Sequence, residues 1–204
     1  MAHKRKSGKA RIVARADLPT RYGKFTILGI EGANAAESAV ALVHGKIRGG
    51  DAPLVRIHSQ CLTGDVFHSE RCDCRAQLEM ALERTAHARC GIVLYLPQEG
   101  RGIGLMNKLK AYELQDRGMD TVEANRKLGF DADHRDYRFC AHALKLLGVR
   151  AARLLSNNPD KVAQLESGGI SVVERVPCQP PTTRRARTYL LTKKKKLGHL
   201  LEGI

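Results

Sequence analysis

The chain has 204 residues, of which 43% are hydrophobic and 27% are charged, a composition typical of a globular protein with one well-buried domain. No apolar run approaches the ~20 residues that cross a bilayer, so we expect no membrane span and no membrane partner. The net charge of +14 is compatible with nucleic acid, with a phosphorylated small molecule or with plain solubility, and does not choose between them.

The N-terminal segment is basic. No apolar core of about 7–15 residues follows residues 1–7, as a secretory signal would require, so we expect a cytoplasmic protein. Residues 1–20 show little apolar periodicity and are predicted to form a basic, largely flexible arm. The folded domain is predicted to span residues 21–177.

Short apolar runs predict strands in the first half of that domain. Residues 25–30, 38–43 and 54–58 are rich in apolar and β-branched side chains and are separated by Gly, Asn, Asp or Pro. From Arg75 to about His87 the apolar positions recur at helical spacing, and residues 91–96 form a buried apolar run. A helix followed by a further strand is therefore expected.

The second half alternates between helices and strands. Helices are predicted over residues 103–117, ending at Gly118, and 135–147, ending at Gly148. Next come a strand at 153–156, a helix at 159–167 and a strand at 170–173. The pattern predicts an α/β layered single domain with a mixed sheet flanked by helices. Residues 178–204 form a basic tail that we expect to be mobile.

Three of the six cysteines lie close together in the sequence. Cys61, Cys72 and Cys74 have the spacing C-x10-C-x-C, which can bring three soft ligands to one zinc ion. A fourth position left for water is typical of catalytic zinc, although His58 or His68 could close the site. The spacing alone leaves open that these are simply buried thiols. Cys90, Cys140 and Cys178 are interpreted as small buried apolar residues.

The residues around the cysteines form longer motifs. RIHSQCLTGD (56–65) is followed by RCDC (71–74), and QEGRGIGL (98–105), DTVEAN (120–125) and LLSNNP (154–159) lie further along. Together they resemble the GTP cyclohydrolase II family over roughly residues 20–177. The resemblance implies zinc-dependent hydrolysis of GTP that opens the imidazole ring and releases formate and pyrophosphate. The implied product is 2,5-diamino-6-ribosylamino-4(3H)-pyrimidinone 5′-phosphate, made in the first step of riboflavin biosynthesis.

The resemblance also implies roles for individual residues. Cys61, Cys72 and Cys74 match the zinc ligands. The positions that match GTP contacts are Arg56, Ile57, His58, Ser59, Gln60, Gln77, Glu99, Gly100, Arg101, Thr121, Ser156 and Lys161. Mg²⁺ is expected with the triphosphate, because this hard ion prefers phosphate oxygens. A homodimer is implied by the resemblance alone.

Three positions match catalytic residues of the family. Asp133 matches a general acid–base, Arg135 a residue that attacks the α-phosphorus, and Tyr112 a tyrosine at the ring-opening site. From chemistry alone, Arg135 could instead stabilise the departing pyrophosphate. A surface ion pair between Asp133 and Arg135, and core packing of Tyr112, are the alternatives without catalysis.

The sequence departs from the family pattern at three places. Gln60 replaces a common glutamate and removes a charge beside Cys61, whereas Ser156 replaces a common threonine and keeps the hydroxyl. The segment after Pro177 lacks an Asn-rich stretch before Tyr189, which would affect closure over the substrate.

Two other functions are compatible with parts of the sequence. The charge and the lysine run at 193–196 suggest a nucleic-acid-binding zinc protein, but structural zinc modules usually pair two ligand halves, and few aromatic residues are available for stacking. We therefore expect no specific nucleic-acid partner. A family member of altered chemistry, stopping at the ring-opened formamide or inactive, is disfavoured because Tyr112, Asp133 and Arg135 are present.

Overall fold

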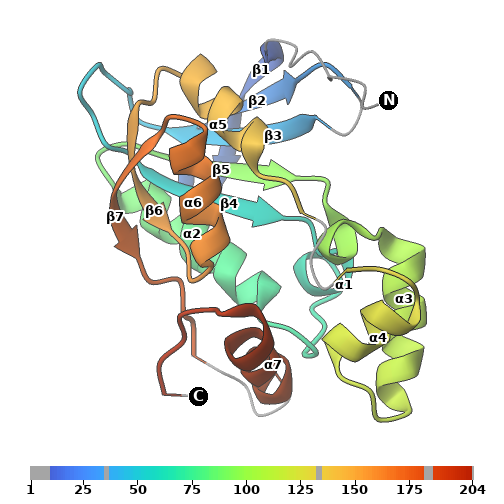
Figure 1. The fold of residues 1–204 in the computed structure, drawn as a ribbon. Helices are drawn as coiled ribbons and strands as arrows, with labels where there is room; N and C mark the ends of the chain where they lie inside the picture. The colour runs from blue at the N-terminus through green and yellow to red at the C-terminus, as the bar shows by residue number, and fades with distance from the viewer. Residues whose placement is uncertain (1–9, 35–36, 132–134, 182–185, 204) are drawn as a thin grey trace.

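A seven-stranded mixed sheet forms the centre of the computed structural model, which describes residues 10–34, 37–131, 135–181 and 186–203 (Figure 1). The strand order is β1-β2-β3-β5-β4-β6-β7. The strands are β1 (Arg11–Thr20), β2 (Gly23–Glu31), β3 (Ser38–His44), β4 (Leu54–Ser59), β5 (Gly91–Leu96), β6 (Ala151–Leu155) and β7 (Ser171–Val176). Neighbours from β1 to β5 pair antiparallel, and those from β5 to β7 pair parallel, which confirms the predicted mixed sheet.

The central strands β4 and β5 are buried almost throughout. Parallel strands covered on both faces require near-continuous apolar runs, and GIVLYL of β5 is such a run. In β4 the run is interrupted by Arg56 and His58, which are 5% and 2% exposed. Buried polar side chains need partners, so these two residues mark the end of the sheet where the functional site lies.

Helices cover both faces of the sheet. The main core joins the sheet to α5 (Arg138–Leu146) and α6 (Pro159–Ser167) through residues such as Leu144 and Leu165. On the other face α2 (Cys74–His87) packs Ala81 against Leu54 and Val93. The predicted helix–sheet–helix layering is therefore confirmed, with small shifts at the element ends.

A second group of helices gathers beyond the carboxyl ends of β4 and β5 (Figure 1). They are α1 (Leu62–Asp65), the 3-10 helix η1 (Glu99–Gly102), α3 (Leu105–Asp116), α4 (Thr121–Lys127) and α7 (Arg187–Leu197). α4 packs against α3 on one side and α7 on the other. Among the described residues, no helix combines the length and apolarity needed to span a membrane.

The prediction of a flexible arm over residues 1–20 is wrong for residues 11–20. These residues form β1, which pairs with β2 along nearly its whole length. Most β1 side chains are exposed, so main-chain hydrogen bonds hold the strand in place. Because neither face of β1 is buried, the alternation of apolar and polar residues that predicts a strand is weak in its sequence. Residues 1–9 lie outside the described part of the chain.

The C-terminal tail contains a helix, α7, that no sequence pattern predicted. α7 and the residues around it form a small apolar cluster of Ala186, Leu190 and Leu201. Exposed ion pairs from Lys196 to Asp120 and Glu123 connect α7 with α4. The mobility of this tail stays a prediction.

Close packing of α5 against α6 generates a stability prediction. A Cβ added at Gly168 would lie 2.3 Å from the Cβ of Ala141, which forces the helices apart. Gly168→Ala is expected to lower the free energy of unfolding in urea by about 1–3 kcal/mol, as overpacked cores do. Gly49→Ala, which meets nothing within 4 Å, should change it by less than about 0.5 kcal/mol. Equal stability of the two variants would refute the close packing.

Candidate active site

The three clustered cysteines converge at the carboxyl end of β4. Cys61 lies two residues after that strand, Cys74 is the first residue of α2, and Cys72 precedes the N-cap of this helix. Their sulfur atoms all lie within 4.8 Å of one another, and those of Cys61 and Cys72 are 3.7 Å apart. A Cβ at Gly64 would lie 3.0 Å from the Cys72 sulfur, so glycine leaves room for the cluster. Three converging soft donors fit zinc.

Neither nearby histidine completes this cluster. The Nε2 atom of His58 lies 3.1 Å from Asp65, and that of His68 lies 3.0 Å from a guanidinium nitrogen of Arg75. Within the described part of the chain, the group that could hold a metal consists of the three cysteines alone. The donor set therefore leaves a tetrahedral ion one position for a non-protein ligand.

The buried carboxylate of Asp65 fixes the cysteine loop to the sheet. Its Oδ2 atom accepts hydrogen bonds from the main-chain N–H of Cys61 at 3.0 Å and from the hydroxyl of Tyr95 at 2.9 Å. His58 donates to the same carboxylate and stacks on the Tyr95 ring. Burial lowers the pKa of His58, although Asp65 acts in the opposite direction, so the imidazole is neutral. Cys61 is thereby held at the edge of the sheet.

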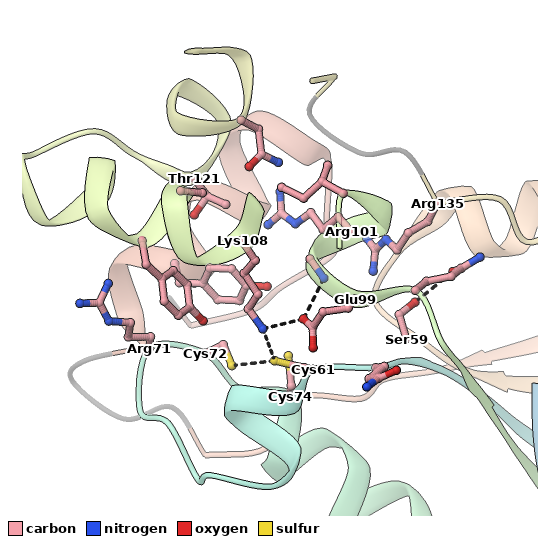
Figure 2. A pocket seen from close by; sticks show the side chains of 18 of the residues that line it. Ser59, Cys61, Arg71, Cys72, Cys74, Glu99, Arg101, Lys108, Thr121 and Arg135 are labelled. Atoms are coloured by element: carbon pink, nitrogen blue, oxygen red, sulfur yellow. Dashed lines mark hydrogen bonds and ion pairs between the residues drawn. The ribbon is translucent and has the colours of Figure 1, made fainter. Parts of the chain in front are cut away.

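Lys108 brings a positive charge to the thiol cluster. Its ammonium group lies 3.1 Å from the Cys61 sulfur and 2.7 Å from Glu99, and both side chains point toward the cysteines (Figure 2). Burial opposes this charge, but Glu99 and Cys61 together raise the pKa of Lys108. Glu99 also accepts hydrogen bonds from the N–H groups of Leu62 and Gly100. The opposite charges of Lys108 and Glu99 therefore compensate each other beside the sulfur atoms.

The thiols share charge unequally. Hydrogen bonds from Cys72 and Cys74, with help from Lys108, lower the pKa of Cys61 against the effect of burial. Hydrogen bonding to Cys61 and burial raise the pKa of Cys72 to about 11 and also raise that of Cys74. The free cluster thus favours one thiolate, at Cys61.

Two adjoining cavities open beside the cysteines. The predicted residues lining the first are Ser59, Gln60, Cys61, Cys72, Cys74, Glu99, Gly100, Arg101, Tyr112, Thr121 and Arg135. Those lining the second are Arg56, His58, Ser59, Cys74, Gln77, Arg101, Arg135, Ser156 and Lys161. Arg101 and Arg135 line both, and Arg101 has a φ of 61°, which is uncommon for a non-glycine residue. The structure brings nearly all predicted residues to one place.

Two predicted site residues do not fit this description. The side chain of Ile57 is fully buried in the core, and only its carbonyl oxygen faces the site, where it accepts a hydrogen bond from Lys161 at 2.7 Å. Any contact of Ile57 with substrate would therefore come from its main chain, and this contact stays a prediction. Asp133 lies outside the described residues.

Tyr112 lies near the cysteine cluster and is not packed in the main core. Its hydroxyl lies 3.1 Å from that of Thr63, and the guanidinium of Arg71 lies over its ring. Burial raises the pKa of Tyr112 to about 12, so the phenol keeps its proton near neutral pH.

The second cavity has a cationic lining. Arg56 donates to the carbonyl of Leu155 at 3.1 Å and to Gln77 at 2.6 Å, which fixes its direction. Burial and then repulsion from Arg56 and Arg135 lower the pKa of Lys161 well below its ordinary value. An anion in this cavity would relieve that repulsion and favour the charged lysine.

Several residues of the site were missed in the sequence. Lys108 is one of two lysines on α3, and a solvated charge is the ordinary expectation for a helical lysine. Tyr189, Lys193 and His199 come from the tail and line the second cavity. Asp73 lies between two cysteines, and its contact with Lys193 joins positions 120 residues apart. No local pattern marks such a contact.

The chain resembles one family along most of its length. The family model described as GTP cyclohydrolase II matches residues 10–177. A "GTP cyclohydrolase-2" of Buchnera aphidicola subsp. Acyrthosiphon pisum is 50% identical over 190 residues, which cover 93% of this chain and 98% of that protein. A "GTP cyclohydrolase-2" of Haemophilus influenzae (strain PittEE) is 50% identical over 194 residues, covering 95% and 90%.

Two further matches involve longer proteins. The "Riboflavin biosynthesis protein RibBA" of Endomicrobium trichonymphae is 50% identical over 192 residues, and the chain spans 48% of that relative's length. A crystal structure of RibBX, a two-domain 3,4-dihydroxy-2-butanone 4-phosphate synthase from A. baumannii, matches 84% of this chain and 41% of its own, with a TM-score of 0.49 and 20% identity.

The neutral buried state of His58 generates a prediction about pH. Folding lowers the pKa of His58, so the unfolded chain binds the proton first and stability should fall as the pH drops below about 6.5. Between about pH 7.5 and 5.5, the free energy of unfolding in urea should fall less steeply in His58→Gln than in the wild type. The difference in slope should be up to about 1.4 kcal/mol per pH unit. The exposed His87→Gln variant should follow the wild type. Equal slopes in all three proteins would contradict this assignment.

Proposed function

The chain belongs to the GTP cyclohydrolase II family, and from this premise we propose that it hydrolyses GTP with a zinc ion held by Cys61, Cys72 and Cys74. The reaction would open the imidazole ring, release formate and pyrophosphate, and give 2,5-diamino-6-ribosylamino-4(3H)-pyrimidinone 5′-phosphate. This reaction is the first step of riboflavin biosynthesis. The main support is the juxtaposition of a three-thiol cluster, open at one position, with a cationic cavity. One molecule with a ring to hydrolyse and a triphosphate would fill both.

The cysteine cluster supplies the hydrolytic part of the proposal. When bound, a zinc ion with an open position activates water near neutral pH and acts as a Lewis acid. Lys108 offsets the negative charge of Cys61, which lies 3.1 Å away. Gln60 next to Cys61 lines the same cavity without adding a charge. We assign guanine to this first cavity.

Residues around the first cavity would orient the purine. Glu99 is buried, and Lys108, Leu62 and Gly100 use three of the roughly four lone-pair sites of its carboxylate, so one site remains to accept from the donor edge of guanine. The protonated hydroxyl of Tyr112 can donate a proton or a hydrogen bond at the ring-opening site. Thr121 lines the cavity from α4.

The second cavity would hold the triphosphate, accompanied by Mg²⁺. Arg56, Arg101 and Lys161 supply charged donors, and Ser59 and Ser156 supply hydroxyl groups. Arg135 lines both cavities and is assigned to the phosphate end, where it would stabilise the departing pyrophosphate. Asp133, two residues earlier, is assigned the general acid–base role.

The proposal extends to assembly and location. We expect a homodimer in the cytoplasm, as the family resemblance implies. Light scattering of the purified protein should give twice the mass of 22.5 kDa, and a monomeric mass would refute the dimer.

Incubation with GTP tests the proposed reaction. Zinc-loaded protein with Mg²⁺ should release formate and pyrophosphate in equal amounts and form the pyrimidine product. Pyrophosphate without formate would indicate altered chemistry at the phosphate end only. Absence of formate from fully zinc-loaded protein would refute the proposal.

Removal of one thiol tests the metal assignment. Cys72→Ser should lose zinc, measured by elemental analysis, together with formate production. Mutation of a residue that only hydrogen-bonds to a metal ligand typically lowers activity by about 10–100-fold, so loss of a ligand itself should lower formate production by more than about 100-fold. The control Cys90→Ala, a buried cysteine beside the other end of β5, should keep both zinc and activity. A fully active Cys72→Ser protein without zinc would contradict the assignment.

A further inference from the structure

The C-terminal helix places one buried lysine in the cationic cavity. Lys193 of α7 is 8% exposed and lines the second cavity. Its ammonium nitrogen lies 2.7 Å from Asp73 Oδ1 and 4.4 Å from the centre of the Tyr189 ring. The next two residues, Lys194 and Lys195, are exposed. Only one member of this lysine run therefore faces the site.

Several basic side chains line this cavity. Lys193 lines it together with Arg56, Arg101, Arg135 and Lys161, and among the described residues no carboxylate lines it. His199 also lines the cavity, and burial, followed by repulsion from Lys193 and Arg135, lowers the pKa of that imidazole to about 3. A polyanion is the ligand that this lining favours.

Asp73 neutralises Lys193 in the free protein. Its Oδ1 atom pairs with Lys193, and its Oδ2 atom accepts a hydrogen bond from Gln77. Gln77 in turn accepts from Arg56 at 2.6 Å, so the contacts run from α7 to β4. Asp73 thus holds the ammonium group of Lys193 at the wall of the cavity.

We propose that Lys193 is a further substrate-binding residue, whose ammonium group contacts the triphosphate of bound GTP. The inference rests on the proposed function, because it takes the same nucleotide as the ligand. An ammonium group has three donors, so Lys193 can keep its contact with Asp73 while it donates to a phosphate oxygen. Binding of the nucleotide then holds α7 against the site, and a ligand without phosphates lacks this contact.

Binding measurements on full-length, zinc-loaded protein test the proposal. The probes are a non-hydrolysable GTP analogue, inorganic tripolyphosphate and guanosine, each followed by calorimetry. Lys193→Gln should weaken the first two by at least about tenfold, the effect of losing a charged hydrogen bond, and leave guanosine within about twofold. Lys193→Arg should retain most of the affinity. Lys194→Gln, on the same helix and exposed, should match the wild type.

Asp73→Asn separates phosphate binding from a purely structural role. This variant breaks the same ion pair but keeps the Lys193 ammonium, so tripolyphosphate affinity should exceed that of Lys193→Gln. Equal losses in the two variants, or wild-type affinity in Lys193→Gln, would overturn the proposal. Zinc content and thermal unfolding verify that each variant remains folded and metal-loaded.

The outcome is distinguishable from failure of the proposed function. Absence of formate from wild-type protein, with the Lys193 effect on tripolyphosphate intact, would refute GTP hydrolysis and support the phosphate contact. Formate production by the wild type, with unchanged tripolyphosphate binding in Lys193→Gln, would support GTP hydrolysis and refute the phosphate contact of Lys193.

Discussion

The buried carboxylate of Asp65 is the contact on which the position of the site depends. It receives donors from β4 through His58, from the cysteine loop through the main chain of Cys61 and from β5 through Tyr95. Because these groups are buried, loss of the carboxylate would leave each donor unsatisfied, at a cost of about 1–3 kcal/mol per group. The first thiol is consequently fixed to the two most buried strands of the sheet.

The topology explains why the remaining parts meet at this thiol. β4 and β5 are parallel, and their last residues, Ser59 and Leu96, are paired. The segments that follow the two strands therefore leave the sheet at the same edge. The segment after β4 leads to Cys61, and the segment after β5 leads to Glu99. Ligands of open α/β sheets bind at such an edge. α3 then adds Lys108, and α7 adds Lys193. Glu99 pairs with Lys108 next to the thiols, and basic side chains line the second cavity.

Sequence patterns predicted the parts of this structure that local physics determines. The strands β2 to β5 have apolar runs, and α6 begins after Asn158 with a proline in its first turn, a common helix start. The three cysteines are recognisable because metal ligands restrict residue type and spacing. α4 was missed although Asp120 and Glu123 form a capping box that its sequence shows.

Other parts depend on contacts between distant residues and have no local signature. β1 depends on pairing with β2, and α7 combines a lysine run with a few apolar residues that pack only in the folded chain. The pairs Lys108–Glu99 and Lys193–Asp73 join separate elements. A motif gives the position of Ile57 along β4 but not the face that its side chain occupies, which is buried in the core.

The central claim is that three thiolates of this chain hold zinc and leave one position open toward the cavity. X-ray absorption at the zinc edge measures that ligand set directly in the zinc-loaded protein. The account predicts three sulfur atoms and one oxygen or nitrogen per zinc, with the sulfur atoms unchanged and the light-atom shell altered when a non-hydrolysable GTP analogue binds. Four sulfur atoms, or a shell in which nitrogen atoms replace sulfur, would contradict it.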